Sequence, residues 1–110
     1  MEVVVDAMNP TIFEIQAEFC KAMGNAGRLQ ILHLLRERPK SVSEICRETG
    51  LLQGTVSRHL ASLRSVGVVT AEKHGAGTVY RITDGKIIEV CDLVRCVLVE
   101  HIQKRSRFIE

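Results

Sequence analysis

The chain has 110 residues with 45% hydrophobic, 25% charged and 4% aromatic side chains, which fits one folded domain over residues 1–110 and excludes a disordered tail. It has no Trp, one Tyr and three Phe, and therefore differs from single-stranded nucleic-acid binders that stack bases on aromatic rings. The net charge of +2 at pH 7 is too small to indicate a nucleic-acid partner by itself, so a binding face would need a local cluster of basic residues.

Two helices are predicted in the first third of the chain. The first spans residues 9–24 and begins at Asn9 and Pro10, because Asn can cap a helix and Pro suits the first helical position. The second begins at Asn25 and is stopped by Pro39.

A short helix and a longer helix follow within residues 41–66. Ser41 and Glu44 have the spacing of a capping box, which predicts the start of the short helix. The longer helix runs from about Gln53 to Val66 and buries every third or fourth residue. This pair of helices is expected to form a helix-turn-helix.

The sequence period then changes from helical to two within residues 68–83. Strands over 68–74 and 78–83 flank a three-residue, glycine-containing loop at 75–77, which predicts a β-hairpin. A last helix is expected over 84–105. The order α-α-α-α-β-β-α is that of a mostly α, α+β fold, the winged helix-turn-helix, in which the hairpin is the wing.

The longer helix carries the polar groups that suit DNA recognition. Its predicted solvent face has small hydrogen-bonding side chains and guanidinium groups, which pair with base edges and phosphates: Gln53, Thr55, Ser57, Arg58, Ser62 and Arg64. In residues 53–81, four basic residues stand against one Glu, a local net charge of +3, and His59 and His74 are further donors. The alternative is an ordinary solvated helix beside a hairpin, but the element order favours DNA binding.

Several segments resemble the ArsR/SmtB family of bacterial and archaeal repressors, namely 25–32, 43–45, 53–63, 67–69 and 80–82. The Val-Ser-x-His-Leu-x-x-Leu pattern at 56–63 is the most specific of them. The resemblance covers about residues 12–105. It implies a homodimer formed by the first and last helices, operator binding in the apo state, and release when an inducer binds. By position, it assigns Gln53, Thr55, Ser57, Arg58 and His59 to the DNA-reading helix, and Lys73, His74 and Arg81 to the wing.

Two positions depart from the family pattern. Ala26 stands where the family often has Pro, and Leu52 stands where it has Ser before the DNA-reading helix. Loss of that Ser cap, together with up to about 1 kcal/mol of helix propensity lost at Gly54, predicts a looser start of this helix.

The resemblance also allows the family's sensing sites to be checked by position, and each lacks ligands here. The Cys-x-Cys site before the helix-turn-helix corresponds to Ser41 and Ser43, and the metal site of the last helix has Lys86 in place of His, with Val97 further along. The second-helix cysteine of a family redox switch corresponds to His33.

The remaining sensor candidates are three cysteines on the first and last helices: Cys20, Cys91 and Cys96. Three thiolates would suit a soft ion, with arsenite favoured and antimonite, Cd, Zn or Pb also considered. Two thiols with Cα atoms within about 7 Å could instead form a disulfide or polysulfide link. A third alternative is that these cysteines only pack, which is also the role expected of Cys46.

Other classes of protein were weighed against a DNA-binding regulator. A Cys–His nucleophile would need a pocket and an orienting group, neither of which the sequence shows, so an enzyme is not expected. A winged helix can also serve only as a protein-interaction module, which would have no steep salt dependence on duplex DNA. Residues 1–6 lack signal-peptide features, and no apolar run approaches the roughly 20 residues of a membrane span, so we expect a cytoplasmic protein without a membrane partner.

Overall fold

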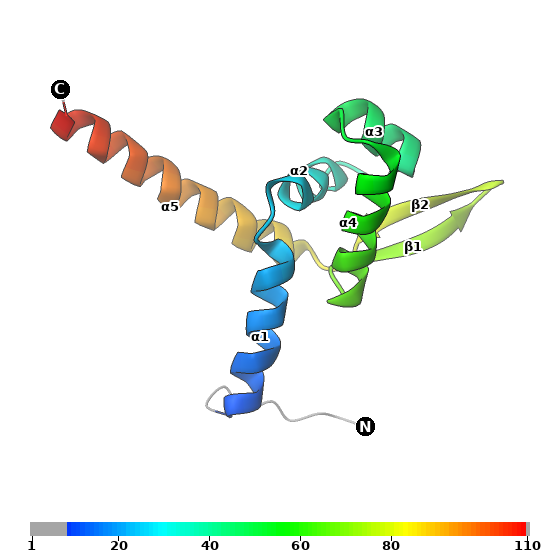
Figure 1. The fold of residues 1–110 in the computed structure, drawn as a ribbon, viewed down its shortest axis with the longest axis horizontal. Helices are drawn as coiled ribbons and strands as arrows, with labels where there is room; N and C mark the ends of the chain where they lie inside the picture. Colours follow the sequence, from blue (N-terminus) through cyan, green and yellow to red (C-terminus); the bar gives the residue numbers. More distant parts are fainter. Residues whose placement is uncertain (1–8, 110) are drawn as a thin grey trace.

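The computed structural model describes residues 9–109, and the side chains of residues 9–105. Residues 1–6, in which no signal peptide was predicted, lie outside the described residues. The elements follow the predicted order: α1 (Pro10–Met23), α2 (Ala26–Leu35), α3 (Val42–Thr49), α4 (Gln53–Ser65), β1 (Val69–His74), β2 (Gly77–Ile82) and α5 (Gly85–Ile109). Figure 1 shows α2, α3, α4 and the hairpin gathered together, while α1 and α5 extend away from them.

The helix boundaries follow local capping chemistry. Asn9 and Asn25 are the N-caps of α1 and α2, and each side chain accepts a backbone hydrogen bond. The capping box is present at the start of α3, where Ser41 Oγ accepts from the Glu44 amide at 3.2 Å and Glu44 Oε1 accepts from the Ser41 amide at 3.2 Å. Gly50 ends α3 with a φ of 77°, a left-handed conformation that suits glycine. These predicted caps are confirmed.

The core lies where α2, α3 and α4 meet the first strand. Its buried side chains are Ile31, Leu32, Leu35, Ile45, Val56, Leu60, Leu63, Val68 and Val69. The three α4 members of this set are the stripe that the sequence predicted to face inward. Cys46 packs against the same cluster, as expected of a small apolar side chain.

The predicted hairpin loop was one residue too long. Gly77 pairs with His74, so the loop consists of Gly75 and Ala76 alone. Gly75 has a φ of 62° and Ala76 has no positive φ, which is the pattern of a two-residue turn with glycine in its first central position. The last helix also continues past residue 105 to Ile109, since no glycine or proline interrupts it there.

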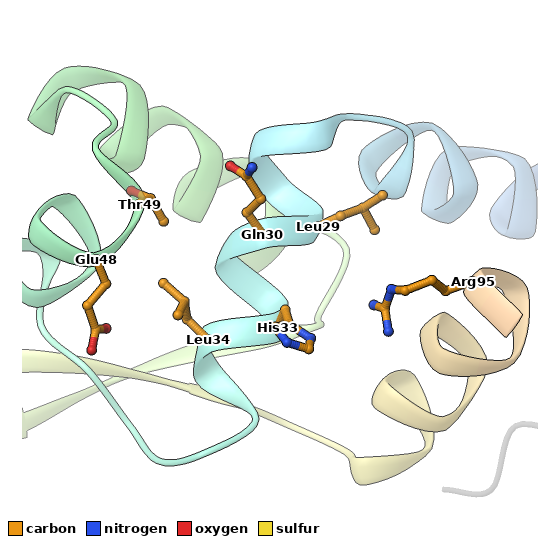
Figure 2. A pocket seen from close by; sticks show the side chains of 7 residues that line it. All are labelled: Leu29, Gln30, His33, Leu34, Glu48, Thr49 and Arg95. Carbon is orange, nitrogen blue, oxygen red and sulfur yellow. The ribbon is translucent and has the colours of Figure 1, made fainter. Parts of the chain in front are cut away.

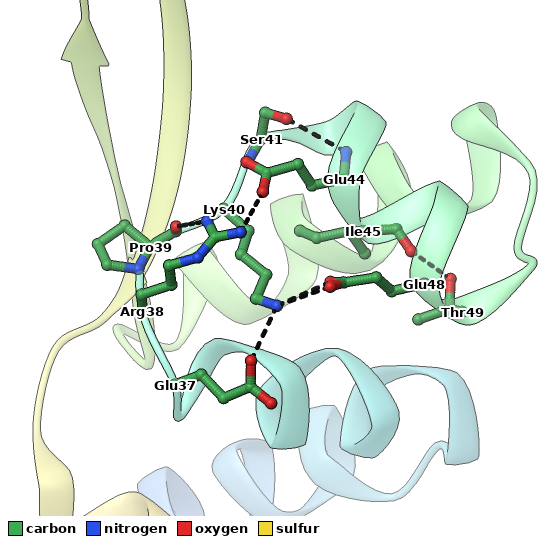
Figure 3. A network of polar contacts seen from close by, with 9 residues as sticks. All are labelled: Glu37, Arg38, Pro39, Lys40, Ser41, Glu44, Ile45, Glu48 and Thr49. Atoms are coloured by element: carbon green, nitrogen blue, oxygen red, sulfur yellow. Dashed lines mark hydrogen bonds and ion pairs between the residues drawn. The ribbon is translucent and has the colours of Figure 1, made fainter.

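A buried lysine attaches the wing to the helix-turn-helix (Figure 3). The backbone of Lys40 pairs with that of Tyr80 through two hydrogen bonds of 3.1 and 2.8 Å. Only 1% of Lys40 is exposed, and its Nζ donates to Glu48 Oε2 at 2.8 Å and to Glu37 Oε2 at 3.3 Å. The hydrogen bond that Lys40 donates to Glu48 raises the pKa of Lys40 and outweighs the effect of burial. The loop before α3 is thereby fixed to β2.

Candidate nucleic-acid interface

The face of α4 opposite the core is open to solvent. Exposed residues on it are Gln53, Gly54, Ser57, Arg58, Ala61, Arg64 and Ser65. At about 100° per residue, Gly54, Ser57 and Ala61 fall within about 60° of one another and form a line of small residues along the helix. Because these side chains are short, the α4 backbone can approach a groove closely, while Arg58 and Arg64 flank the line with positive charge.

Thr55 lies at the edge of this face. Its side chain is half-buried, and its Oγ1 accepts a hydrogen bond of 3.4 Å from Arg58 Nη2. This contact links the first turn of α4 to the guanidinium that the sequence predicted to contact DNA. The structure therefore brings Gln53, Thr55, Ser57 and Arg58 together at the N-terminal half of the helix.

The start of α4 lacks a side-chain cap. Leu52 has the extended backbone of an N-cap residue but makes no side-chain hydrogen bond, and its side chain is 78% exposed. The side-chain cap is therefore absent, as the leucine at this position implies, and the looser helix start stays a prediction.

His59 points toward α2 instead of the open face. Its ring is half-buried, and Nδ1 accepts a hydrogen bond of 3.3 Å from Arg28 Nε. The approach is so close that a Cβ at Gly27 would lie 2.8 Å from His59 Nε2. Burial, followed by the charges of Arg28 and Arg58, lowers the pKa of His59. His59 spans the gap between α4 and α2, so we assign it a positioning role.

Arg28 extends this connection to α1. Its Nη1 donates to the Ala22 carbonyl at 3.0 Å, and its backbone amide donates to the Asn25 cap. One side chain therefore holds the last turn of α1 and the His59 ring together. Sequence reasoning missed this contact, although His59 is three residues after Val56 and four before Leu63, a spacing that places it on the buried side of α4.

The three predicted wing residues are all exposed, but they differ in whether their charge is paired. Lys73 and His74 are exposed at the end of β1, next to the turn. Arg81 is exposed too, but its Nη2 pairs with Glu72 Oε1 at 2.6 Å across the two strands. The Glu72 carboxylate offsets the charge of Arg81, so Lys73 brings the larger net positive charge to the wing. A helix face beside a two-stranded ribbon is an arrangement that can contact a DNA groove and its flanking backbone.

The three candidate sensor cysteines lie on α1 and α5. Cys20 and Cys96 are exposed, and Cys91 is half-buried. Burial raises the pKa of Cys91, and the hydrogen bond from Cys96 Sγ to Glu100 Oε1, 3.5 Å long, raises the pKa of Cys96. Both shifts favour the protonated thiol at neutral pH, whereas the thiolate is the metal ligand and nucleophile.

Within one chain these thiols do not form a metal site. Among the described side chains, no group of three or more His, Cys, Asp or Glu residues could hold a metal ion. Ser41, which matches one position of the family's Cys-x-Cys site, caps α3 instead, and the amide of Lys86 donates to Asp84 Oδ1 at 2.9 Å at the start of α5. A site made of three thiolates would therefore need side chains from two chains.

A groove of about 450 Å³ separates α2 from α3 and α5 (Figure 2). Figure 2 shows Arg95 reaching from α5 toward His33 on α2, with Leu29 and Leu34 alongside. The other lining residues are Gln30, Glu48 and Thr49. No cysteine lines this groove, so it is distinct from the candidate thiol sites.

Both extended helices expose apolar side chains. The large exposed ones on α5 are Val90, Leu93, Val94, Val97, Leu98, Val99 and Ile102, and those on α1 are Phe13 and Ile15. An exposed apolar surface of this extent marks an interaction site. None of the helices in residues 9–109 has the length and apolar character needed to cross a membrane.

The sequence and the fold are both similar to those of known proteins. The family described as "Bacterial regulatory protein, arsR family" matches residues 25–71, from the N-cap of α2 into β1. Rv0081 of Mycobacterium tuberculosis, named as an HTH-type transcriptional regulator, is 34% identical over 100 residues, which is 90% of this chain and 88% of Rv0081. The crystal structure of Rv0081 superposes with a TM-score of 0.80 and covers 89% of this chain and 98% of that one.

Two further relatives carry more specific descriptions. Mb0332 from Mycobacterium bovis has a solution structure described as a homodimeric winged helix-turn-helix DNA-binding domain, with a TM-score of 0.80, 31% identity, and coverage of 94% of this chain and 95% of that one. The transcriptional repressor SmtB of M. tuberculosis is 32% identical over 79 residues, 72% of this chain and 58% of SmtB. These relatives are regulators of transcription and not enzymes. The chain belongs to the ArsR family of winged helix-turn-helix, DNA-binding transcriptional regulators.

Proposed function

We propose that the chain is a homodimeric repressor that binds an inverted-repeat operator through the two α4 helices of the dimer. The observation that carries this proposal is the outward face of α4, where small residues run between Arg58 and Arg64 opposite a fully buried stripe. The description of Mb0332 as a homodimer and of SmtB as a repressor support it. Two recognition helices related by a twofold axis would read half-sites about 34 Å apart, one helical turn of DNA, or a multiple of that.

The DNA-binding part is tested by Arg58→Ala, with Lys86→Ala as a matched loss of one positive charge outside the interface. We expect Arg58→Ala to weaken operator binding about tenfold or more, because a good guanidinium contact contributes about 1–3 kcal/mol. Affinity of the wild-type chain should fall steeply with added salt as counterions are released, and the slope should be shallower for Arg58→Ala. Equal affinities for both variants would contradict the role of Arg58, and a flat salt dependence of the wild-type chain would favour a protein-interaction module.

The direction of regulation is tested separately with a reporter gene placed behind the operator. A repressor lowers reporter expression when the wild-type chain is present, and Arg58→Ala restores it. Raised expression with the wild-type chain would identify an activator and contradict this part of the proposal.

We further propose that the release signal acts on Cys20, Cys91 and Cys96 between the two chains, with arsenite as the favoured inducer. All three thiols lie on the two helices that expose the apolar surface, and thiolates from two chains could complete a soft-ion site. An inducer can shift the dimer away from DNA only if it binds the released form more tightly. A disulfide or polysulfide link between two of the thiols is the alternative chemistry.

Three arms distinguish these signals: operator release is titrated with arsenite, with divalent cations and with polysulfide. The variant with Cys20→Ser, Cys91→Ser and Cys96→Ser should bind the operator normally but fail to release it. Because the raised pKa values keep Cys91 and Cys96 protonated, a divalent cation must displace protons and should release the operator more readily at higher pH. Neutral arsenous acid instead condenses with the thiols, whose protons leave in the water formed, so release by arsenite should depend much less on pH. Undiminished release from the triple variant would show that the thiols are not the sensor.

A further inference from the structure

Leu52 combines high exposure with a position at the start of the recognition helix. Its 78% exposure is the largest among the big apolar side chains in the described part of the chain, while the neighbouring Leu51 packs against the core. As the N-cap of α4 it forms no side-chain hydrogen bond, although Ser, Thr, Asp or Asn at this position would satisfy a helix amide. Neither core packing nor helix capping accounts for a leucine here.

The space around the first turn of α4 is also open. A Cβ built on Gly54 would meet only the Nη1 atom of Arg58, at 3.7 Å, and Gln53 beside it is exposed. Apart from the adjoining residues and the helix's own backbone, no other protein atom lies within 4 Å of that position. Leu52 directly precedes the exposed residues Gln53 and Gly54 at the first turn of α4.

We infer that Leu52 is a specificity-determining residue whose side chain contacts the 5-methyl group of a thymine in each half-site of the operator. The inference rests on the proposed operator binding through α4. In helix-turn-helix proteins, the N-terminal residues of the recognition helix contact base edges. The thymine methyl is the apolar group that the major groove presents to such residues, and an exposed leucine has no polar atom with which to read any other base edge.

The test uses a duplex selected from random sequence by the wild-type chain. Each conserved thymine is replaced by deoxyuridine, which removes only the methyl group, and dissociation constants are measured. We expect one thymine in each half-site to show about a fourfold loss of affinity on replacement, since burying one methyl group is worth about that factor. Leu52→Ala should bind the thymine and uracil duplexes equally, whereas Leu52→Met, which keeps an apolar contact, should retain the difference.

Arg58→Ala is the control, because it should weaken binding to both duplexes and leave the thymine-to-uracil ratio unchanged. A wild-type chain that is insensitive to uracil at every conserved thymine, a selected site with no conserved thymine, or full sensitivity in Leu52→Ala would overturn the inference while operator binding stands. Failure to enrich any duplex would instead contradict operator binding itself, and the inference with it.

Discussion

At the scale of single residues, His59 illustrates how a side chain of α4 can hold the helix in place from outside its open face. Its ring accepts from Arg28 and lies against Gly27, and Arg28 in turn holds the Ala22 carbonyl at the end of α1. The position of α4 therefore depends on a neutral ring at residue 59, because a protonated ring would donate toward a guanidinium that is itself a donor.

This contact predicts a pH dependence of stability. The pKa of His59 is lowered in the folded chain, so the unfolded chain binds more protons between that lowered pKa and the ordinary histidine value of 6.5. The free energy of unfolding should fall as the pH drops below 6.5. His59→Asn, which keeps an acceptor near the position of Nδ1 but does not titrate, should lose this part of the pH dependence in chemical denaturation between pH 7.5 and 5. An unchanged profile in His59→Asn would contradict the role assigned to the ring.

At the scale of secondary-structure elements, the capping carboxylate of Glu44 at the start of α3 should make stability depend on acidic pH. Arg38 donates to Glu44 Oε2 at 2.5 Å, and this hydrogen bond is the main reason that the pKa of Glu44 is lowered to about 2. A carboxylate with a lowered pKa stabilises the fold above its ordinary value of 4.5, and that contribution is lost as the pH falls toward 2.

Glu44→Gln should therefore flatten the acid limb of the stability profile between pH 4.5 and 2, because glutamine can still accept from the Ser41 amide but carries no charge for Arg38. Thermal melts over this pH range measure the effect. Glu14→Gln, at an exposed position of α1, is the control and should retain the wild-type acid limb. A Glu44→Gln profile that matches the wild type would show that the ion pair contributes nothing.

Elements were predictable from sequence where local chemistry fixes them. The caps at Asn9, Asn25 and Ser41 depend only on residues within one turn, and each is present. The length of the hairpin loop depends on backbone angles at Gly75, and the pairing of Lys40 with Tyr80 joins residues far apart in sequence; neither follows from a local pattern.

The candidate interface was likewise predictable only where it depends on a local pattern. The outward face of α4 follows from its buried stripe, which periodicity reveals. The inward orientation of His59, at the edge of that stripe, does not follow from periodicity, since it depends on the contact with Arg28 of α2. The ion pair of Arg81 with Glu72 likewise requires the strand register that places residue 72 opposite residue 79 and residue 70 opposite residue 81.

At the scale of the whole molecule, the exposed apolar side chains of α1 and α5 predict self-association. Leu93 is 66% exposed in the middle of this surface. Leu93→Arg places a charge there and should shift the chain toward monomer in sedimentation experiments at micromolar concentration, with a matching loss of operator affinity. Leu52→Ser removes an even more exposed apolar side chain outside this surface and should leave the dimer intact. A wild-type chain that sediments as a monomer would contradict the proposed assembly.

The most direct test of the central claim is the affinity of the chain for its selected operator when five base pairs are inserted between the half-sites. Five base pairs rotate one half-site by about half a helical turn, given 10–10.5 base pairs per turn. Two α4 helices held in one dimer could then no longer enter both major grooves from the same side of the duplex. We expect affinity to fall to that of a single half-site, with two chains bound per uninterrupted operator. Unchanged affinity for the interrupted duplex would show that the two α4 helices do not act from one dimer.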